Sequence, residues 1–410
     1  MLNRCNLSYR ASAGILRNKI YIAVCSILLL DAGLLFGQAS PTTAHAGIRD
    51  FVEYWAASRL FWYGGNPYSP AELMALQQTA GWNGAGPLIM WNPPWSLLFT
   101  LPFGLVEHTT SQFIWLLVQL ILILYSAQQL WRIYGDSARS SRLPWVLALT
   151  FVPTLFVLII GQITPLVLAG LTLLLYAERK QSLWTTSASL LILSIKPQVL
   201  YLFWIVFALW LLEKRPWRVV WRAALVGVAA GLVPVLFDPN IYSQYLALYG
   251  VPTVLKPMDW PVPTLRNVIR VFFDIDQIWL QLAPTILAII WAVYYWQRHK
   301  HQWVWLKQLP LLLLVSVATS FFVWTYDQVV LLPAIIEGAT WIKQGSVPWY
   351  RTWSARIYVA INSLHLLQRF WLTEELWYFW LAPALLLNYL LFLWEKQTIG
   401  RPIGDPRELA

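Results

Sequence analysis

A series of apolar segments, separated by short polar or basic stretches, most constrains how this chain can fold. Segments of spanning or near-spanning length lie at roughly residues 20–38, 88–106, 112–131, 144–160, 163–178, 183–196, 198–212, 219–236, 277–297, 308–323, 327–343, 355–367 and 375–394. A helix of about 20 apolar residues is long enough to cross the hydrocarbon core of a bilayer. The chain is 58% hydrophobic and 12% charged, whereas a soluble domain has about 25% charged residues. These features predict an all-α polytopic membrane protein.

The basic residues are scattered through the short stretches between these segments. The formal net charge of +10 invites a nucleic-acid partner, but scattered basic loops follow the positive-inside rule and argue against one. By this rule the cytoplasmic loops are 132–142, 179–180, 214–222, 298–307, 343–356 and 396–401. The long stretches 38–87 and 238–277 are then outer loops, and the 27 Trp and 19 Tyr residues fit aromatic belts at the two interfaces of the lipid bilayer.

The number of crossings follows from the charges at the two ends of the chain. The thirteen segments would place the termini on opposite sides, whereas the basic residues near both ends predict two cytoplasmic termini. Segment 88–106 is the best candidate for one that does not cross, because Pro93, Pro94 and Pro102 break helices; a short helix elsewhere could equally be the exception. Segment 20–38 is interpreted as an uncleaved span rather than a signal peptide, since its length suits a span. The prediction is one domain, residues 1–410, with about 12 transmembrane helices.

Motifs of several common enzyme classes are absent from the sequence. Two cysteines, Cys5 and Cys25, exclude a disulfide framework and a Cys-rich metal site, and the five histidines are dispersed. There is no Gly-rich phosphate loop, no His-Glu-x-x-His and no Gly-x-Ser-x-Gly. We therefore expect no metal and no cofactor, and a nucleotide-binding site of the Rossmann type has no support in the sequence.

Asp50 stands at the predicted outer face, in an aromatic stretch directly after the first apolar segment. A carboxylate held close to hydrocarbon is costly, so it is a functional candidate. The alternative is that Asp50 caps the N-terminus of a helix that starts near Phe51. Glu53, one turn further on, is the second candidate acid.

Other polar residues interrupt apolar runs at the same predicted face. Lys196 could extend its ammonium group to the interface from a helix end, or face a cavity and bind phosphate as a point charge. Asp327, which follows Tyr326, could pair with Lys196 or Arg266 as a structural ion pair, or belong to the site. Gln162, after Gly161, is typical of a break at a helix end.

Several short motifs occur in an order that resembles glycosyltransferase family 87, the polyprenol-phosphate-mannose-dependent membrane transferases of the GT-C class. They are Asp50-Phe51-Val52-Glu53-Tyr54-Trp55-Ala56-Ala57, Gly65-Asn66-Pro67-Tyr68, Asn92-Pro93-Pro94-Trp95, Gly161-Gln162, Lys196-Pro197-Gln198 in part, and Pro263-Thr264-Leu265-Arg266. One departure concerns Val323-Trp324-Thr325-Tyr326-Asp327, where relatives often carry Ser-Trp-x-His-His. The missing histidine pair puts donor handling in doubt.

The resemblance implies a GT-C-type helical bundle at the plasma membrane, with its active site facing the outer or periplasmic side. Such an enzyme moves a sugar, either mannose or another hexose or pentose, from a polyprenyl-phosphate carrier to a hydroxyl of a glycan or glycolipid acceptor, with inversion. Asp50 is implied as the general base, and Lys196 and Arg266 as cations that bind the leaving phosphate. The other implied substrate-binding residues are Glu53, Tyr54, Arg59, Tyr68, Asn92, Gln162, Gln198, Tyr326 and Asp327. The alternatives are a transporter or flippase of a lipid-linked sugar and a membrane scaffold without chemistry.

Overall fold

The computed structural model describes residues 50–135, 141–251, 257, 260–344 and 352–399. These ranges are helical and contain no β-strand, as the apolar pattern predicts. The expected first span, 20–38, lies outside the described residues.

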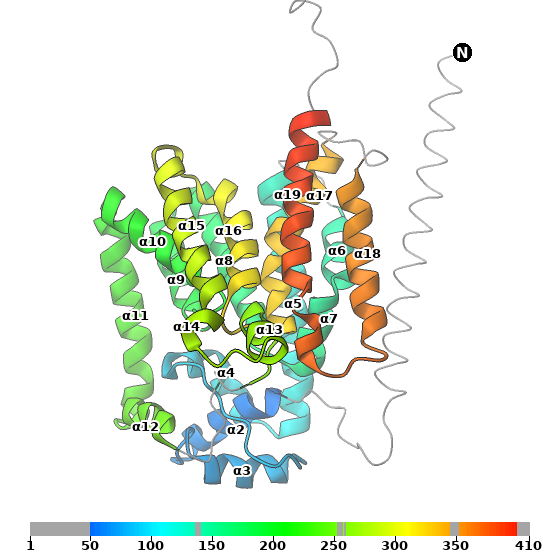
Figure 1. Cartoon of the computed structure of the whole chain (residues 1–410). Helices are drawn as coiled ribbons and strands as arrows, with labels where there is room; N and C mark the ends of the chain where they lie inside the picture. The colour runs from blue at the N-terminus through cyan, green and yellow to red at the C-terminus, as the bar shows by residue number, and fades with distance from the viewer. Residues whose placement is uncertain (1–49, 136–140, 252–256, 258–259, 345–351, 400–410) are drawn as a thin grey trace, which may run out of the picture.

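Most of the long helices stand side by side in one bundle (Figure 1). They are α5 (His108–Gly135), α6 (Leu143–Thr150), α7 (Val152–Ile160), α8 (Thr164–Lys180), α9 (Leu183–Leu193), α10 (Tyr201–Lys214), α11 (Trp217–Phe237), α15 (Ala283–His299), α16 (Trp305–Thr319), α17 (Leu332–Lys343), α18 (Trp353–Gln368) and α19 (Leu381–Ile399). Each of these helices overlaps one of the apolar segments predicted from the sequence. Their inward faces share one apolar core that includes the fully buried Trp131 and Phe203.

Within the described residues, three helical stretches are long and apolar enough to cross a membrane, namely His108–Gly135, Trp217–Phe237 and Glu375–Thr398. A fourth is counted if α6 and α7, which meet at a 68° bend, form one broken span. Other bundle helices are shorter, such as α9 with 11 residues and α16 with 15. The protein therefore has the helices of a membrane protein, and the predicted count of about 12 spans is not confirmed.

A second group of helices lies across one end of the bundle (Figure 1). This end layer consists of α2 (Phe51–Trp62), α3 (Pro70–Thr79), α4 (Leu97–Gly104) and α12 (Ile241–Ala247). The predicted outer loop thus forms α2 and α3 in its described part. Segment 88–106 forms a short 3₁₀ turn at Pro94–Ser96 and the helix α4. The eight residues of α4 extend about 12 Å and cannot cross a bilayer.

The close packing of α2 on α4 gives the end layer a core of its own. A Cβ atom on Gly104 would lie 2.6 Å from the backbone of α2, so only glycine permits this approach. Polar side chains reinforce the contact, because Ser58 donates to Thr100 at 2.9 Å and Trp62 donates to the Leu101 carbonyl at 2.7 Å. These contacts fix α2 against α4.

Shorter elements lie between these helices along the chain. They are the helices α13 (Leu265–Phe272) and α14 (Ile278–Gln281), and the 3₁₀ turns η2 (Pro94–Ser96), η3 (Leu248–Gly250), η5 (Lys300–Gln302), η6 (Thr325–Leu331) and η8 (Glu375–Tyr378).

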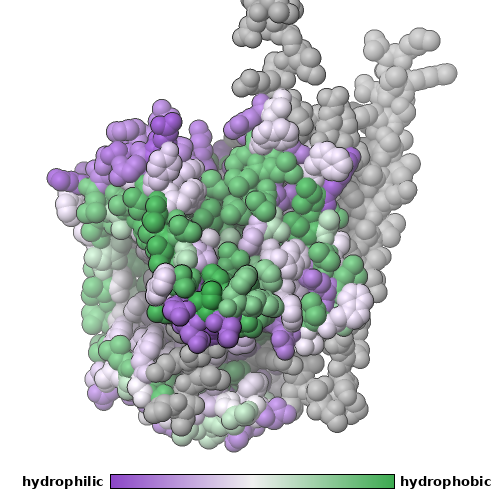
Figure 2. Space-filling model, viewed as in Figure 1, coloured by the Kyte–Doolittle hydropathy of each residue, from purple (hydrophilic) through white to green (hydrophobic). Residues whose placement is uncertain are grey.

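The opposite end of the bundle carries basic residues in the last turns of several helices, such as Lys214 of α10 and Arg298 of α15. On the face that Figure 2 shows, hydrophilic side chains gather at this end and hydrophobic side chains cover much of the bundle below it. Two glutamates here join neighbouring helices. Glu178 accepts the backbone N–H groups that start α16, both at 2.7 Å, and Glu395 accepts the first N–H of α18 at 2.7 Å. We refer to this part as the basic end.

Candidate active site

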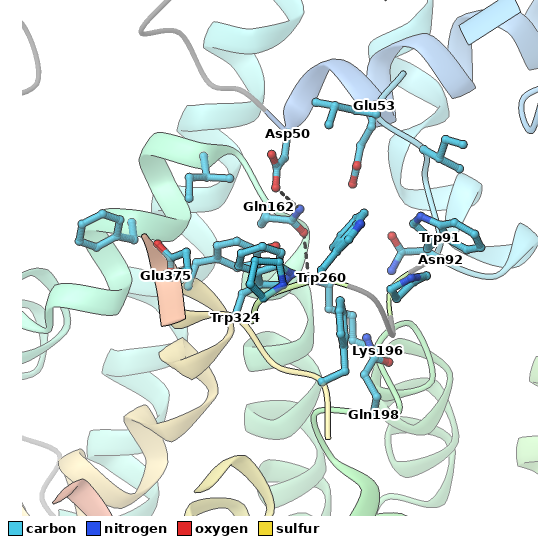
Figure 3. A pocket seen from close by; sticks show the side chains of 18 of the residues that line it. Asp50, Glu53, Trp91, Asn92, Gln162, Lys196, Gln198, Trp260, Trp324 and Glu375 are labelled. Atoms are coloured by element: carbon cyan, nitrogen blue, oxygen red, sulfur yellow. Dashed lines mark hydrogen bonds between the residues drawn. The ribbon is translucent and has the colours of Figure 1, made fainter. Parts of the chain in front are cut away.

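A cavity of about 1180 Å³ lies between the end layer and the bundle. Its walls come from the start of α2, from α7, from the turn at 195–198, and from the stretches 321–326 and 366–375. Figure 3 shows that Asp50 and Glu53 of the end layer face this space from one side and that bundle residues such as Lys196 line it from another. Segments far apart in the sequence therefore meet at one polar site.

Asp50 occupies the position before the first residue of α2, but its side chain makes no capping hydrogen bond to that helix. Its backbone N–H instead donates to the Ile160 carbonyl at 2.9 Å, which ties the start of α2 to the end of α7. Its carboxylate accepts a hydrogen bond from the Gln162 amide at 2.5 Å. The carboxylate is thus held at the cavity by a residue of the bundle.

Glu53 lines the same cavity one helical turn away and is 8% exposed. Burial, followed by the charge of Asp50, raises the pKa of the Glu53 carboxyl well above its usual range. The two acids are therefore unequal, because Glu53 holds a proton under conditions where an ordinary carboxyl has lost it.

Gln162 links the acidic residue Asp50 to the basic residue Lys196. Gly161, in a left-handed conformation with φ of +79°, ends α7 and turns the chain toward the cavity. The side-chain oxygen of Gln162 accepts from the Tyr54 hydroxyl at 2.6 Å and from the Lys196 ammonium group at 2.8 Å. With its oxygen so occupied, the amide must present its N–H₂ group to Asp50, which fixes the rotamer of Gln162.

Lys196 is buried and uses each of its three N–H donors. Besides Gln162, it donates to Thr164 at 3.1 Å and to Asp327 at 2.8 Å. Asp327 is 1% exposed and also accepts from the Thr164 hydroxyl at 2.6 Å. Lys196 and Asp327 therefore form a buried ion pair, one of the alternatives that the sequence left open. The Asp327 carboxylate balances the charge of the lysine.

The Asn92-Pro93-Pro94-Trp95 stretch holds the turn that carries Lys196. The Asn92 amide donates to the Ile195 carbonyl at 3.1 Å, and the Trp95 indole donates to the Ser194 hydroxyl at 3.0 Å. Asn92 lines the cavity, and so do Tyr54, Gln198 and Tyr326.

Four residues singled out from the sequence lie outside the described cavity lining. Arg59 donates to the Gly104 carbonyl at 3.2 Å and joins α2 to α4. Tyr68 is buried and lines a smaller pocket of about 460 Å³ between the start of α3 and α12. Arg266 is buried in the first turn of α13, and Asp327 reaches the cavity only through Lys196.

The structure adds residues that sequence reasoning missed. Arg369 and Glu375 line the cavity and form an ion pair at 2.6 Å, and Glu375 also accepts from Thr325 at 2.5 Å. Trp91, Trp260 and Trp324 line it as well. Arg369 and Glu375 stand at the short stretch between the apolar segments 355–367 and 375–394, and two opposite charges at that position were the available signal.

The chemistry that these residues offer is acid–base and electrostatic. The Asp50 carboxylate, the Glu53 carboxyl with its raised pKa, the fixed Gln162 amide and two ion pairs, Lys196–Asp327 and Arg369–Glu375, surround one space. Within the described part of the chain, no group of three or more His, Cys, Asp and Glu side chains is placed to hold a metal ion.

Comparison with known families agrees with this arrangement of a membrane-type helical bundle and a polar cavity. The sequence model of glycosyltransferase family 87 matches residues 91–317, which is more than half of the 410 residues, and the chain belongs to this family. It is therefore a member of a glycosyltransferase family. The match contains Gln162 and Lys196, begins after Asp50 and ends before Asp327. No curated protein matches the chain.

Proposed function

We propose that this protein transfers a sugar from a polyprenyl-phosphate carrier to an acceptor hydroxyl at the outer face of the plasma membrane, with inversion at the sugar carbon. The observation that carries the proposal is the Asp50 carboxylate, held by Gln162 at the edge of a large cavity with both polar and apolar walls. Binding sites for one small ligand usually have about 300–1,000 Å³. A cavity of about 1180 Å³ has room for a donor headgroup beside an acceptor.

Asp50 is the proposed general base. It would accept the proton of the acceptor hydroxyl while the acceptor oxygen bonds to the anomeric carbon and the bond from that carbon to the phosphate oxygen breaks. The electron pair of the broken bond leaves with the lipid phosphate, and a single displacement of this kind inverts the sugar carbon. The raised pKa of Glu53 favours its protonated form, which cannot accept a proton, so Asp50 is the preferred candidate.

Gln162 and Lys196 are proposed to act through Asp50. The Gln162 amide orients the carboxylate, and Lys196 orients Gln162. A base must lie within hydrogen-bond reach of the proton that it removes, so a fixed carboxylate is more effective than a mobile one. Mannose is one candidate sugar, and another hexose or a pentose is possible in the absence of the histidine pair that relatives often carry.

The test uses purified protein in lipid nanodiscs with polyprenyl-phosphate donors that carry labelled mannose, another hexose or a pentose. A glycan and glycolipid extract supplies acceptors, and Asp50→Asn is the control. We expect one donor to yield a labelled glycan together with free polyprenyl phosphate. Movement of intact donor across a vesicle membrane, with no cleavage of any donor, would contradict the proposal and identify a transporter.

A further inference from the structure

Lys196 has no hydrogen-bond donor left for a phosphate. Its three donors are taken by Gln162, Thr164 and Asp327, and the Asp327 carboxylate balances its charge. Arg266 lies outside the described cavity lining. A lipid phosphate in this cavity needs another cationic partner.

Arg369 has the properties of such a partner. It lines the cavity, and only one of its terminal nitrogens, Nη1, has a hydrogen-bond partner among the described residues, the Glu375 carboxylate at 2.6 Å. Nε and Nη2 are buried and have no hydrogen-bond partner there. Buried polar groups of a protein are nearly always satisfied, so these two donors indicate a site for an acceptor group that the protein itself does not supply.

Two aromatic rings fix the plane of this guanidinium group. Its central carbon lies 3.6 Å from the centre of the Tyr378 ring and 4.0 Å from that of the Phe156 ring. Arg369 is therefore held rigidly between α7 and the turn after α18. A planar, fixed guanidinium group with neighbouring N–H donors suits the oxygens of a phosphate better than a lysine does.

The walls next to Arg369 are apolar. Leu155, Phe156 and Ile159 of α7 and Leu366, Phe370 and Leu372 at the end of α18 line the same cavity. The 68° bend between α6 and α7 turns this face of α7 away from the line of the preceding helix. A polyprenyl chain needs a surface of this kind, because its burial is driven by the apolar area removed from water.

Helix α7 contacts both Arg369 and the segment that carries the proposed base. Phe156 contacts Arg369, and Ile160, four residues later, accepts the backbone N–H of Asp50. Arg369 and the start of α2 therefore border the same helix at positions about 6 Å apart along its axis.

We propose that Arg369 binds the phosphate of the polyprenyl carrier, with the polyprenyl chain on the apolar α7–α18 wall and the sugar directed at Asp50. This inference rests on the proposed function. Because Nη1 already pairs with Glu375, Nε and Nη2 would donate the hydrogen bonds that hold the singly charged sugar phosphodiester. After transfer the lipid phosphate carries a charge of about −1.5 to −2, and the nearby Glu375 carboxylate then favours its release.

The experiment measures binding of a short-chain polyprenyl phosphate to the full-length protein in nanodiscs, with polyprenol and inorganic phosphate as separate ligands. The test variant is Arg369→Lys, which keeps the charge and loses the planar group. The matched control is Glu375→Gln, which breaks the same ion pair and keeps Arg369. Thermal stability is recorded for each protein.

We expect wild type to bind polyprenyl phosphate more tightly than polyprenol or inorganic phosphate. Arg369→Lys should weaken binding of polyprenyl phosphate about tenfold or more, a loss in the range of charge-assisted bidentate hydrogen bonds, and leave binding of polyprenol unchanged. Glu375→Gln should bind as tightly as wild type or more tightly. Equal binding by wild type and Arg369→Lys, or equal losses in the two variants, would overturn the role of Arg369. A wild-type protein that binds no polyprenyl phosphate would instead count against the proposed function itself.

Discussion

The two ends of this molecule use carboxylates in different ways. At the basic end, both oxygens of Glu178 accept backbone N–H groups at the start of α16, and Glu395 accepts the first N–H of α18 and the Ser354 hydroxyl at 2.6 Å. The first N–H groups of a helix lack partners within the helix. These glutamates supply those partners and join one helix to the next.

At the cavity end, Asp50 directly precedes its own helix, α2, but its side chain makes no capping hydrogen bond to that helix. Its carboxylate accepts from the side chain of Gln162 beside an open space. The difference teaches that the partner of a carboxylate, rather than its position in a helix, separates a structural carboxylate from a candidate catalytic one. The predictions below test this distinction, beginning with the largest expected effect.

Asp50→Asn should reduce the rate of sugar transfer about 10²–10⁴-fold, the usual contribution of a positioned base. The amide keeps the shape of the side chain, so protein yield and binding of polyprenyl phosphate should stay close to wild type. Initial rates with saturating donor measure the first effect, and equilibrium binding measures the second. A parallel loss of binding would show that Asp50 holds the donor instead.

Lys196→Met should destabilise the protein by about 3–5 kcal/mol, because removal of one partner leaves the buried Asp327 carboxylate without its counterion. The double variant Lys196→Met/Asp327→Asn removes both charges and should recover much of that stability. Its transfer rate should nevertheless stay below wild type, since Gln162 has lost the donor that orients it. Thermal unfolding and initial rates of the two variants check this pair of results. A double variant with full activity would contradict the orienting role.

Glu178→Ala should lower the stability by about 1–3 kcal/mol, since it leaves two backbone N–H groups of α16 without an acceptor. The transfer rate per folded molecule should not change. The control is Glu213→Ala, which removes a partly exposed ion pair with Lys300 at 3.3 Å and should cost about 0–1 kcal/mol. Chemical denaturation in detergent gives both values, and a rate that falls with Glu178→Ala at unchanged stability would contradict the division between the two ends.

The pH dependence of stability should carry a small contribution from Glu53. Its pKa in the folded protein is raised above the value of 4.5 expected in the unfolded chain, so its stabilising effect is complete below about pH 4.5 and is lost as the pH rises through the folded pKa. Glu53→Gln cannot ionise and should lose less stability than wild type over that rise. Melting temperatures of both proteins across this range measure the difference, and identical curves would show that Glu53 is not held protonated.

The sequence predicted the helices well because apolar segment length and proline position depend on local chemistry. Segment 112–131 lies within α5, and the proline-rich segment 88–106 forms the short α4. The meeting of Asp50, Gln162 and Lys196 at one cavity also agrees with the order of the motifs and their common predicted side of the membrane.

Charge rules assign a residue to one side of a membrane but do not say which way it faces around the bundle. Arg266 was therefore expected beside Lys196, whereas the structure places it outside the described cavity lining. The position of Arg369 depends on how the end of α18 packs against α7. Phe156 and Arg369, which make this contact, are more than 200 residues apart in the sequence. No local pattern encodes such a contact.

The proposed mechanism depends most on which of two neighbouring acids is the base. The most direct test compares Asp50→Asn and Glu53→Gln in one transfer assay with the same labelled donor and acceptor extract. Glutamine mimics the protonated form of Glu53, and this variant should keep its rate within about tenfold of wild type, while Asp50→Asn loses about 10²–10⁴-fold. If instead Glu53→Gln abolishes transfer and Asp50→Asn retains it, the base is Glu53. Near-normal rates in both variants would contradict a catalytic role for this part of the cavity.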